Sequence, residues 1–354
     1  MQQATPKFQE EYSAKLPALT LLCNLGWTFL SPEQALSERS HKQDEIVLRN
    51  ILRQQLEQRR FTFAGQPHAL SSKAIDNIIT EVCSPALNEG LQAANEKLYN
   101  HLLYGISVTE FVDGKKANPT IALIDWHNPS NNSFLFTEEF SVTRSAGVES
   151  RRPDIICFVN GIPLVVIEAK RPDGKKGPTV EEGISQSLRN QRHDEIPRLF
   201  AYSQLLLSIN STEGRYGTCG TPAKFWAAWR EEDFSEAQMS ALKNQTLSQD
   251  TITNLFNHRN PKDLEWYQNL IAGGELAVTG QDQLLISLLT PTRLLDMTRF
   301  YTLFDKKAGK IVARYQQVFG IKRLIDQISH KRPDGGRNGG VIWHTTGSGK
   351  SFTM

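Results

Sequence analysis

The sequence predicts an α/β protein: a mixed β-sheet flanked by helices, followed by further helices and the beginning of a second α/β domain. Three observations support this prediction. Helical patterns fill roughly the first hundred residues, short β-like runs separated by loop residues follow, and an apolar run beside a glycine-rich loop stands close to the last residue. The chain has 354 residues, which at about 150 residues per domain is long for a single domain.

Composition excludes several classes of protein. Hydrophobic residues make up 39% of the chain and charged residues 22%, which is typical of a soluble globular protein and too apolar for a disordered one. The formal charge of +2 neither favours nor excludes a nucleic-acid partner, so any basic site must be local. We expect a cytoplasmic protein, because no apolar run approaches the roughly 20 residues of a membrane helix and the first residues lack the apolar core of a secretion signal.

The four cysteines indicate a reducing compartment. Cys23, Cys83, Cys157 and Cys219 include no close pair, so neither a disulfide scaffold nor a CxxC zinc or redox motif is expected. We predict four free thiols.

The segment before the predicted sheet is helical. We expect an amphipathic helix over residues 8–25 that ends near Gly26, a second helix over 45–59, and a very long third helix over 71–104 that is rich in Leu, Ala and Glu.

A sheet is expected after this helical segment. The expected elements are strands over 106–112, 121–126, 134–142, 155–159, 162–167 and 205–209, and a helix over 181–190. Asn160-Gly161 separates two of these apolar runs, and this dipeptide between such runs is the strongest short-range signal for a β-hairpin. The alternation of strands with a helix predicts a mixed sheet.

The rest of the chain is mostly helical. We expect helices with polar breaks over 233–304, a helix over 313–328, and a loop that leads into a strand over 341–344. A soft boundary near residue 260 divides the chain into predicted domains 1–260 and 261–354.

Three charged residues interrupt or flank the two apolar runs of the hairpin: Asp154, Glu168 and Lys170. A strand buried on both faces should not carry a carboxylate without a reason, because burying an unpaired charge is costly. Glu168 and Lys170 are two residues apart and therefore face the same side of a strand.

The position of Asp154 depends on the hairpin loop. An ideal two-residue turn at Asn160-Gly161 would place Asp154 and Glu168 on opposite faces. A three-residue loop over 159–161, with Gly161 in the left-handed conformation and a bulge, would pair Asp154 with Val166 and bring both carboxylates to one face. We therefore predict the bulged loop.

Two carboxylates on one face can hold a hard divalent cation such as Mg²⁺. Such an ion can polarise a phosphoryl oxygen and activate a water molecule, and a neighbouring lysine can orient that water or stabilise the developing charge. The arrangement suits phosphodiester hydrolysis. Nearby basic residues suit a polyanionic substrate; they are Arg151, Arg152, Arg171, Lys175 and Lys176. The alternatives are a surface hairpin with a Glu/Lys pair and a solvated charged loop.

A second motif stands at the end of the chain. An apolar strand leads into a loop of the kind whose backbone N–H groups cradle phosphates; the loop is Thr346-Gly347-Ser348-Gly349-Lys350-Ser351. Lys350 would reach the β- and γ-phosphates of a nucleotide and Ser351 would ligate Mg²⁺, although His344 replaces the first glycine of the strict pattern. The alternative is a chance Gly/Ser turn. A nucleotide motor also needs an acidic residue on a later strand, so we expect a truncated or disrupted chain that binds a nucleotide without hydrolysing it.

The two motifs together resemble those of a known family. RPDIICFVNGIPLVVIEAKRP, residues 152–172, resembles the RecB-type PD-(D/E)xK nuclease motif, and WHTTGSGKSFTM, residues 343–354, resembles motor motif I of superfamily 2 helicases. In this order they resemble the R (restriction and translocation) subunit of type I restriction endonucleases, and residues 196–218 and 310–324 resemble its adjoining stretches. The resemblance runs from residue 24 to the last residue. It implies a restriction-endonuclease-like sheet followed by the start of a RecA-like motor domain.

The resemblance also implies residue roles. Asp154, Glu168 and Lys170 match the nuclease triad. Gln186 matches the glutamine of a Gln-x-x-x-Tyr motif, but Asn190 stands at the tyrosine position, and the alternative for Gln186 is an exposed helix glutamine.

The resemblance implies two further residue roles outside the hairpin. Gln317 resembles the glutamine that reads adenine in related motors; its alternative is a place on a helix surface. An additional acidic group on an early helix is common in such nucleases, and Glu10 or Glu11 could be that group.

The implied reaction is Mg²⁺-dependent cleavage of duplex DNA by one subunit of an ATP-dependent complex. The partners are modification (M) and specificity (S) subunits, and S-adenosylmethionine belongs to the modification subunit. Two rival interpretations remain: an ATP-driven translocase fragment whose N-terminal domain only binds DNA, and a docking module for the modification subunit.

Overall fold

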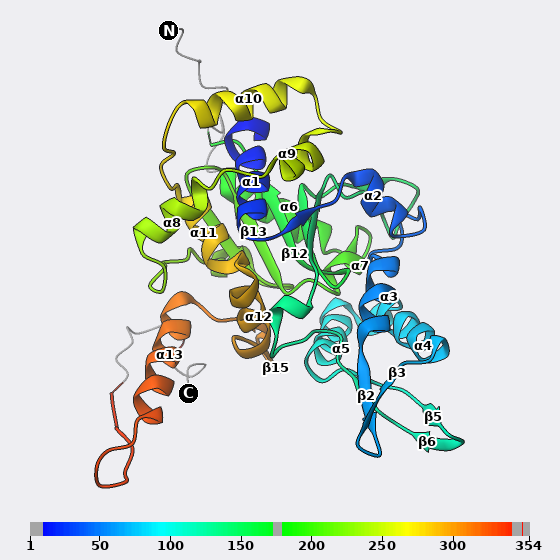
Figure 1. Cartoon of the computed structure of the whole chain (residues 1–354). Helices are drawn as coiled ribbons and strands as arrows, with labels where there is room; N and C mark the ends of the chain where they lie inside the picture. Colours follow the sequence, from blue (N-terminus) through cyan, green and yellow to red (C-terminus); the bar gives the residue numbers. More distant parts are fainter. Residues whose placement is uncertain (1–9, 173–178, 342–348, 350–354) are drawn as a thin grey trace.

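A six-stranded mixed β-sheet lies at the centre of the structure, a computed structural model that describes residues 10–172, 179–341 and 349 (Figure 1). The order of its strands is β1 (Thr28–Phe29), β8 (Phe134–Glu138), β11 (Ile155–Val159), β12 (Ile162–Ala169), β13 (Leu205–Ile209) and β14 (Gly214–Gly217). The pairs β1–β8 and β12–β13 are parallel and the other neighbours are antiparallel. The predicted α/β class with a mixed sheet is confirmed.

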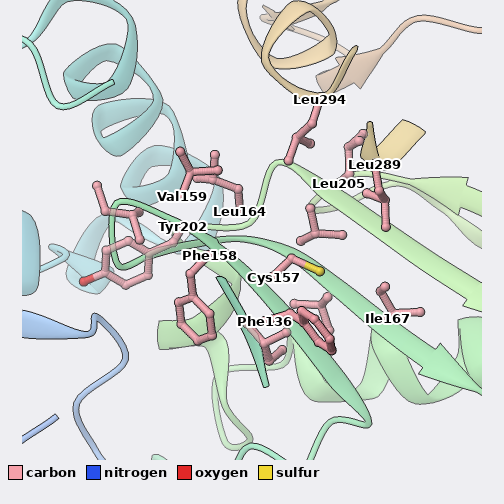
Figure 2. Close-up of a cluster of buried hydrophobic side chains, with 14 of the residues drawn as sticks. Phe136, Cys157, Phe158, Val159, Leu164, Ile167, Tyr202, Leu205, Leu289 and Leu294 are labelled. Carbon is pink, nitrogen blue, oxygen red and sulfur yellow. The ribbon is translucent and has the colours of Figure 1, made fainter. Parts of the chain in front are cut away.

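The central strands are apolar because both faces of the sheet are covered. Every residue of β11, β12 and β13 is buried, as expected for strands that read as continuous hydrophobic runs. Figure 2 shows side chains of these strands packed together with Leu289 of α11 (Gly280–Leu289) and Leu294 of α12 (Pro291–Phe300).

Helices α6 (Thr179–Asn190) and α11 cover opposite faces of the sheet. Ser208 Oγ donates a hydrogen bond of 2.8 Å to Val180 O of α6, whereas Leu284 of α11 and Ile209 both adjoin Gly214. Neighbouring side chains of a strand point to opposite faces. Gly183 lets α6 approach closely, because a Cβ atom there would lie 2.2 Å from Ser208 Oγ.

The β11–β12 turn differs from the predicted loop. Val159 pairs with Ile162, and both residues between them have positive φ (Asn160 52°, Gly161 82°), so the turn has two residues in the left-handed conformation. The predicted three-residue loop is wrong. The extra residue lies farther along, because Cys157 pairs with Val165 and Phe158 with Pro163, which leaves Leu164 as a bulge within β12.

The first helix is confirmed over the residues described. A π-helical turn (Glu11–Lys15) continues into α1 (Leu16–Asn24), and Gly26 follows with φ 93°. The apolar face of α1 packs against α11 and α8 (Glu236–Lys243).

Five other predicted elements need correction. The strand over 106–112 divides into β4 (Ile106–Ser107) and β5 (Glu110–Val112), and the strand over 134–142 ends at Glu138. The long helix over 71–104 is wrong: Pro85 and Gly90 break it into α4 (Ser72–Cys83) and α5 (Leu91–Tyr104). The helix expected over 45–59 begins only at Arg49, as α3 (Arg49–Gln58). The strand over 121–126 reduces to β7 (Thr120–Ile121), because Asp125 accepts hydrogen bonds from the backbone of the next residues and forms a turn.

The other elements before α8 are short. They are α2 (Pro32–Ser37), β2 (Arg60–Phe63), β3 (Gln66–Ala69), η2 (Leu87–Glu89), β4 (Ile106–Ser107), β5 (Glu110–Val112), β6 (Lys115–Ala117), η3 (Pro129–Asn131), β9 (Val142–Thr143), β10 (Ser150–Arg151), α7 (Pro197–Phe200) and η4 (Ala223–Phe225). The hairpins β2–β3 and β5–β6 extend away from the sheet beside α3 and α4 (Figure 1).

Between residues 233 and 329 the elements are helices except for one hairpin. Its elements are α8, α9 (Gln249–Phe256), α10 (Pro261–Ala272), α11, α12, β15 (Thr302–Asp305), β16 (Gly309–Val312) and α13 (Tyr315–Ser329). The expectation of helix up to residue 304 is therefore wrong at β15. The predicted strand over 341–344 lies outside the described residues except for Val341, and the division at residue 260 stays a prediction.

Two of the compositional expectations can be compared with the fold. All four cysteines are free thiols. Among the residues described, no helix combines the length and apolarity needed to cross a bilayer.

Candidate active site

Asp154 and Glu168 face one another at one end of the β11–β12 hairpin. Ile155 pairs with Ile167, and continuing this register by one residue places Asp154 directly across from Glu168, on the same face of the sheet. The bulge at Leu164 therefore produces the shared face that the predicted loop was meant to provide. The predicted pairing of Asp154 with Val166 is wrong, since Val166 pairs with Ile156.

Lys170 joins the two carboxylates. Its Nζ lies 3.4 Å from Asp154 Oδ2 and 3.8 Å from Glu168 Oε2, and it donates a 3.0 Å hydrogen bond to Ala169 O. Asp154 Oδ2 also accepts a 2.8 Å hydrogen bond from the backbone N–H of Ala169. The structure thus brings the three predicted residues to one point, and all three are buried.

Burial and the neighbouring charges shift the pKa values of Glu168 and Lys170. Burial raises the pKa of Glu168 well above its ordinary value, and the negative charge of Asp154 raises it further. Burial opposes the charge of Lys170, but Asp154 and Glu168 outweigh it, so the pKa of Lys170 is raised and the side chain remains an ammonium. Lys170 is therefore a hydrogen-bond donor at neutral pH.

Gln186 contacts the site directly. Its Nε2 donates a hydrogen bond of 2.6 Å to Glu168 Oε2, because α6 packs across β12 and β13. The alternative of an exposed helix glutamine does not describe this side chain, which is half-buried.

The two early acidic residues have different surroundings. Burial raises the pKa of Glu10, on which the charges of Lys170 and Asp154 also act, so Glu10 lies close to the site. Glu11 instead pairs with Arg259 and Lys15. Sequence alone left this choice open because both residues belong to the same helical turn.

An ionic cluster behind the site has no sequence signature. Glu138 contacts Lys15 Nζ at 3.0 Å and His258 Nε2 at 3.0 Å and also pairs with Arg259. Burial opposes its charge, but the hydrogen bond from His258 and the charges of Arg259 and Lys15 lower the pKa of Glu138 to about 2. The next residue, Glu139, donates its backbone N–H to Asp154 O. Because these residues come from segments more than a hundred positions apart, only the fold assembles them.

Two of the basic residues expected near the carboxylate pair are neutralised by carboxylates of the protein. Arg151 binds Glu195 through two hydrogen bonds of 2.5 and 2.8 Å, and Arg152 pairs with Glu139. Arg171 is exposed. The other two predicted cations, Lys175 and Lys176, lie outside the described residues.

The donor set fits a hard cation. Glu168 Oε1 is buried and has no hydrogen-bond partner among the described residues, and a buried polar atom without a partner is costly. Within the same residues no three His, Cys, Asp or Glu side chains are grouped closely enough to hold a metal ion. Mg²⁺ needs only one or two carboxylates because it keeps several waters, so Asp154 and Glu168 suffice.

Gln317 lies at a second candidate site, beside Gly349, the one described residue of the predicted phosphate loop. Gln317 is buried. Its Nε2 donates a hydrogen bond of 3.0 Å to Gly349 O, and its Oε1 accepts a hydrogen bond of 2.8 Å from the backbone N–H of Arg314. A cavity of about 460 Å³ opens beside it, lined also by Tyr216, Phe225, Lys307 and Lys310. The other residues of the predicted phosphate loop lie outside the described residues: Thr346, Gly347, Ser348, Lys350 and Ser351.

The fold and the site define a mixed α/β protein with paired buried carboxylates and a lysine at the end of a central hairpin. The chain belongs to the family described as type I restriction enzyme R protein N terminus, whose model matches residues 7–225. The model of the SWI2/SNF2 ATPase matches residues 316–354. The resemblance inferred from the sequence is thereby confirmed.

Curated relatives agree with this membership. The chain is 29% identical over 290 residues to the type I restriction enzyme HindI endonuclease subunit of Haemophilus influenzae. The matched region covers 80% of this chain and 24% of the relative. It is 25% identical over 381 residues to a Methanocaldococcus jannaschii protein provisionally named type I restriction enzyme MjaIXP endonuclease subunit, over 100% of this chain and 31% of the relative. The chain therefore spans less than a third of the length of these relatives.

Proposed function

We propose that this chain contains the nuclease domain of a type I restriction enzyme R subunit and hydrolyses phosphodiester bonds of duplex DNA with Mg²⁺. The observation that carries the proposal is the convergence of Asp154, Glu168 and Lys170, with Glu168 Oε1 left without a partner among the described residues. The proposed domain covers residues 1–260 and has a restriction-endonuclease-like fold. The names of the relatives support the same class of reaction.

Each residue has a distinct proposed role. Asp154 and Glu168 hold the Mg²⁺ ion, and Glu10 lies near them without completing a group of three carboxylates. The bound ion supplies polarisation of a phosphoryl oxygen and acidifies a coordinated water. Lys170, held as an ammonium, orients the attacking water and stabilises the negative charge that develops on the phosphoryl group. Gln186 fixes the orientation of the Glu168 carboxylate.

Residues 261–354 are proposed to lead into a RecA-like motor domain that binds ATP. Gln317 would read the adenine in the adjoining cavity, the loop 346–351 would hold the phosphates, and Ser351 would ligate the Mg²⁺ of the nucleotide. The match to the SWI2/SNF2 ATPase model supports this second function. The proposed partners are modification and specificity subunits of the same system, with S-adenosylmethionine bound by the modification subunit.

A Mg²⁺ titration by calorimetry tests the nuclease site without requiring activity. We expect the wild-type chain to bind Mg²⁺ and the Glu168→Gln variant to lose this binding, because the amide removes one anionic ligand of nearly equal shape. Glu149→Gln is the matched control, since Glu149 is exposed and pairs with Arg144 away from the carboxylate pair. Equal Mg²⁺ binding by wild type and Glu168→Gln would contradict the proposal and favour a domain that only docks or binds DNA.

Cleavage of supercoiled plasmid by the whole chain is the second test. Asp154→Ala and Lys170→Ala should abolish cleavage while circular dichroism and the unfolding midpoint remain close to wild type. Loss of folding in both variants would instead indicate a structural role for the charged group.

A further inference from the structure

Helix α6 presents a row of polar side chains beside the carboxylate pair. Glu182, Gln186 and Arg189 are spaced by four and three residues, so they share one face of the helix. Gln186 is hydrogen-bonded to Glu168, which fixes the direction of this face. Arg189 therefore stands next to the site, one turn beyond Gln186.

The guanidinium of Arg189 is held in place by its neighbour. Asn190 Oδ1 accepts two hydrogen bonds from it, 3.3 Å from Nε and 3.1 Å from Nη2. Asn190 is 1% exposed and so provides a rigid acceptor. This contact uses part of the guanidinium fork, and the exposed side chain retains further N–H donors.

Arg189 differs from the other arginines of this region in its charge balance. Arg151, Arg144 and Arg192 all contact the buried carboxylate of Glu195. Over the described part of the chain, Arg189 makes no ion pair, and its hydrogen bonds go to a neutral amide.

We infer that Arg189 binds a phosphate group of the DNA strand that enters the site, and that Asn190 is a positioning residue that aims the guanidinium. The inference rests on the proposed nuclease function. A planar guanidinium matches phosphate oxygens through paired N–H donors. An oriented cation that forms no ion pair in the described structure is suited to a polyanion, because no carboxylate occupies its remaining N–H donors. Phosphate contacts of this kind set the register of the strand without reading its sequence.

Fluorescence anisotropy with a labelled duplex tests this inference, using the whole chain in EDTA so that binding is measured without cleavage. We expect Arg189→Gln to weaken binding roughly three- to tenfold. We also expect the plot of log association constant against log salt concentration to become less steep by about one, the change that corresponds to the loss of one phosphate contact. Arg189→Lys should keep the salt slope and lose part of the affinity, because the charge remains and the fork is lost. The matched control is Arg192→Gln, an exposed arginine that already pairs with Asp194 and Glu195, and it should change binding less than about twofold.

The role of Asn190 is tested by a double-mutant cycle. Asn190→Ala should weaken binding on its own but add little to Arg189→Gln, because both changes remove one oriented contact. Full additivity would overturn the positioning role.

The inference and the proposed function fail in different ways. If Arg189→Gln binds DNA as tightly as Arg192→Gln and with the wild-type salt slope, Arg189 does not bind a phosphate, while Mg²⁺ binding that depends on Glu168 would leave the nuclease proposal standing. If the wild-type chain does not bind the duplex at all, the inference about Arg189 is overturned, and the Mg²⁺ titration then decides separately about the nuclease site. Thermal unfolding of each variant separates either result from misfolding.

Discussion

Gln186 on α6 donates a 2.6 Å hydrogen bond to Glu168 on β12, and this contact joins the helix to a fully buried carboxylate. The bond occupies Oε2 and leaves Oε1 as the atom without a partner among the described residues. The helix thus orients the carboxylate so that one oxygen remains for a cation.

The first prediction concerns this contact. Gln186→Leu should reduce Mg²⁺ affinity about tenfold or more, because residues that orient metal ligands typically contribute 10- to 100-fold. Calorimetric titration measures the effect. Ser185→Ala is the control, since Ser185 is exposed on the same helix and its hydroxyl donates a hydrogen bond to Glu181 O, away from Glu168. Unchanged Mg²⁺ affinity in Gln186→Leu would show that Glu168 is oriented without help from α6.

The second prediction concerns the hairpin turn that sets the register. Gly161 has φ 82°, and a Cβ atom there would lie 2.6 Å from Leu48 O. Gly161→Ala should lower the free energy of unfolding by about 2–5 kcal/mol, through left-handed strain and overpacking together.

Gly65, in the β2–β3 hairpin, is the matched control for this change. Its φ is 78°, but nothing lies within 4 Å of its Cβ position, so Gly65→Ala should cost only about 1–2 kcal/mol. Urea unfolding of both variants measures the difference, and equal costs would show that the contact with α3 does not constrain the turn.

The third prediction concerns a buried lysine on β16. Burial lowers the pKa of Lys310 to about 7, and its Nζ donates to Asn95 Oδ1, Ser203 O and Gln204 Oε1 at 2.8, 3.1 and 2.6 Å. An unfolded lysine keeps its proton up to about pH 10.4. Between these values the unfolded state binds more protons, so the free energy of unfolding should rise with pH, by at most about 1.4 kcal/mol per pH unit from this group.

Urea unfolding between about pH 7 and pH 9 measures this dependence. Lys310→Met should flatten the rise, whereas the control Lys307→Met, at an exposed position, should leave it in place. If the slope is the same in both variants, groups other than Lys310 produce it.

The fourth prediction concerns the proposed nucleotide site. Gln317 is held between Arg314 N and Gly349 O beside the 460 Å³ cavity. Gln317→Ala should weaken binding of a fluorescent adenine nucleotide roughly tenfold, the equivalent of one good hydrogen bond. Gln327→Ala, on an exposed turn of the same helix, should have no effect. An equal loss of affinity for a guanine nucleotide would indicate a general disturbance of the cavity and not adenine recognition.

The sequence alone determined the class of fold, the central hairpin and the residues of the candidate site. These are local properties. Continuous apolar runs mark strands buried on both faces, Asn160-Gly161 marks a tight turn, and a spacing of two puts Glu168 and Lys170 on one side of a strand. The order of the two motifs was also enough to indicate the family.

Only the tertiary structure decided how these parts meet. The bulge at Leu164 that brings Asp154 across from Glu168 depends on pairing between strands, and local patterning pointed to the wrong loop. The proximity of Glu10 to the carboxylate pair, the ionic cluster around Glu138 and the support of Arg189 by Asn190 likewise depend on contacts in space. The physical reason is that periodicity reports the environment of one element, whereas charge pairing and orientation depend on which distant segments the folded chain brings into contact.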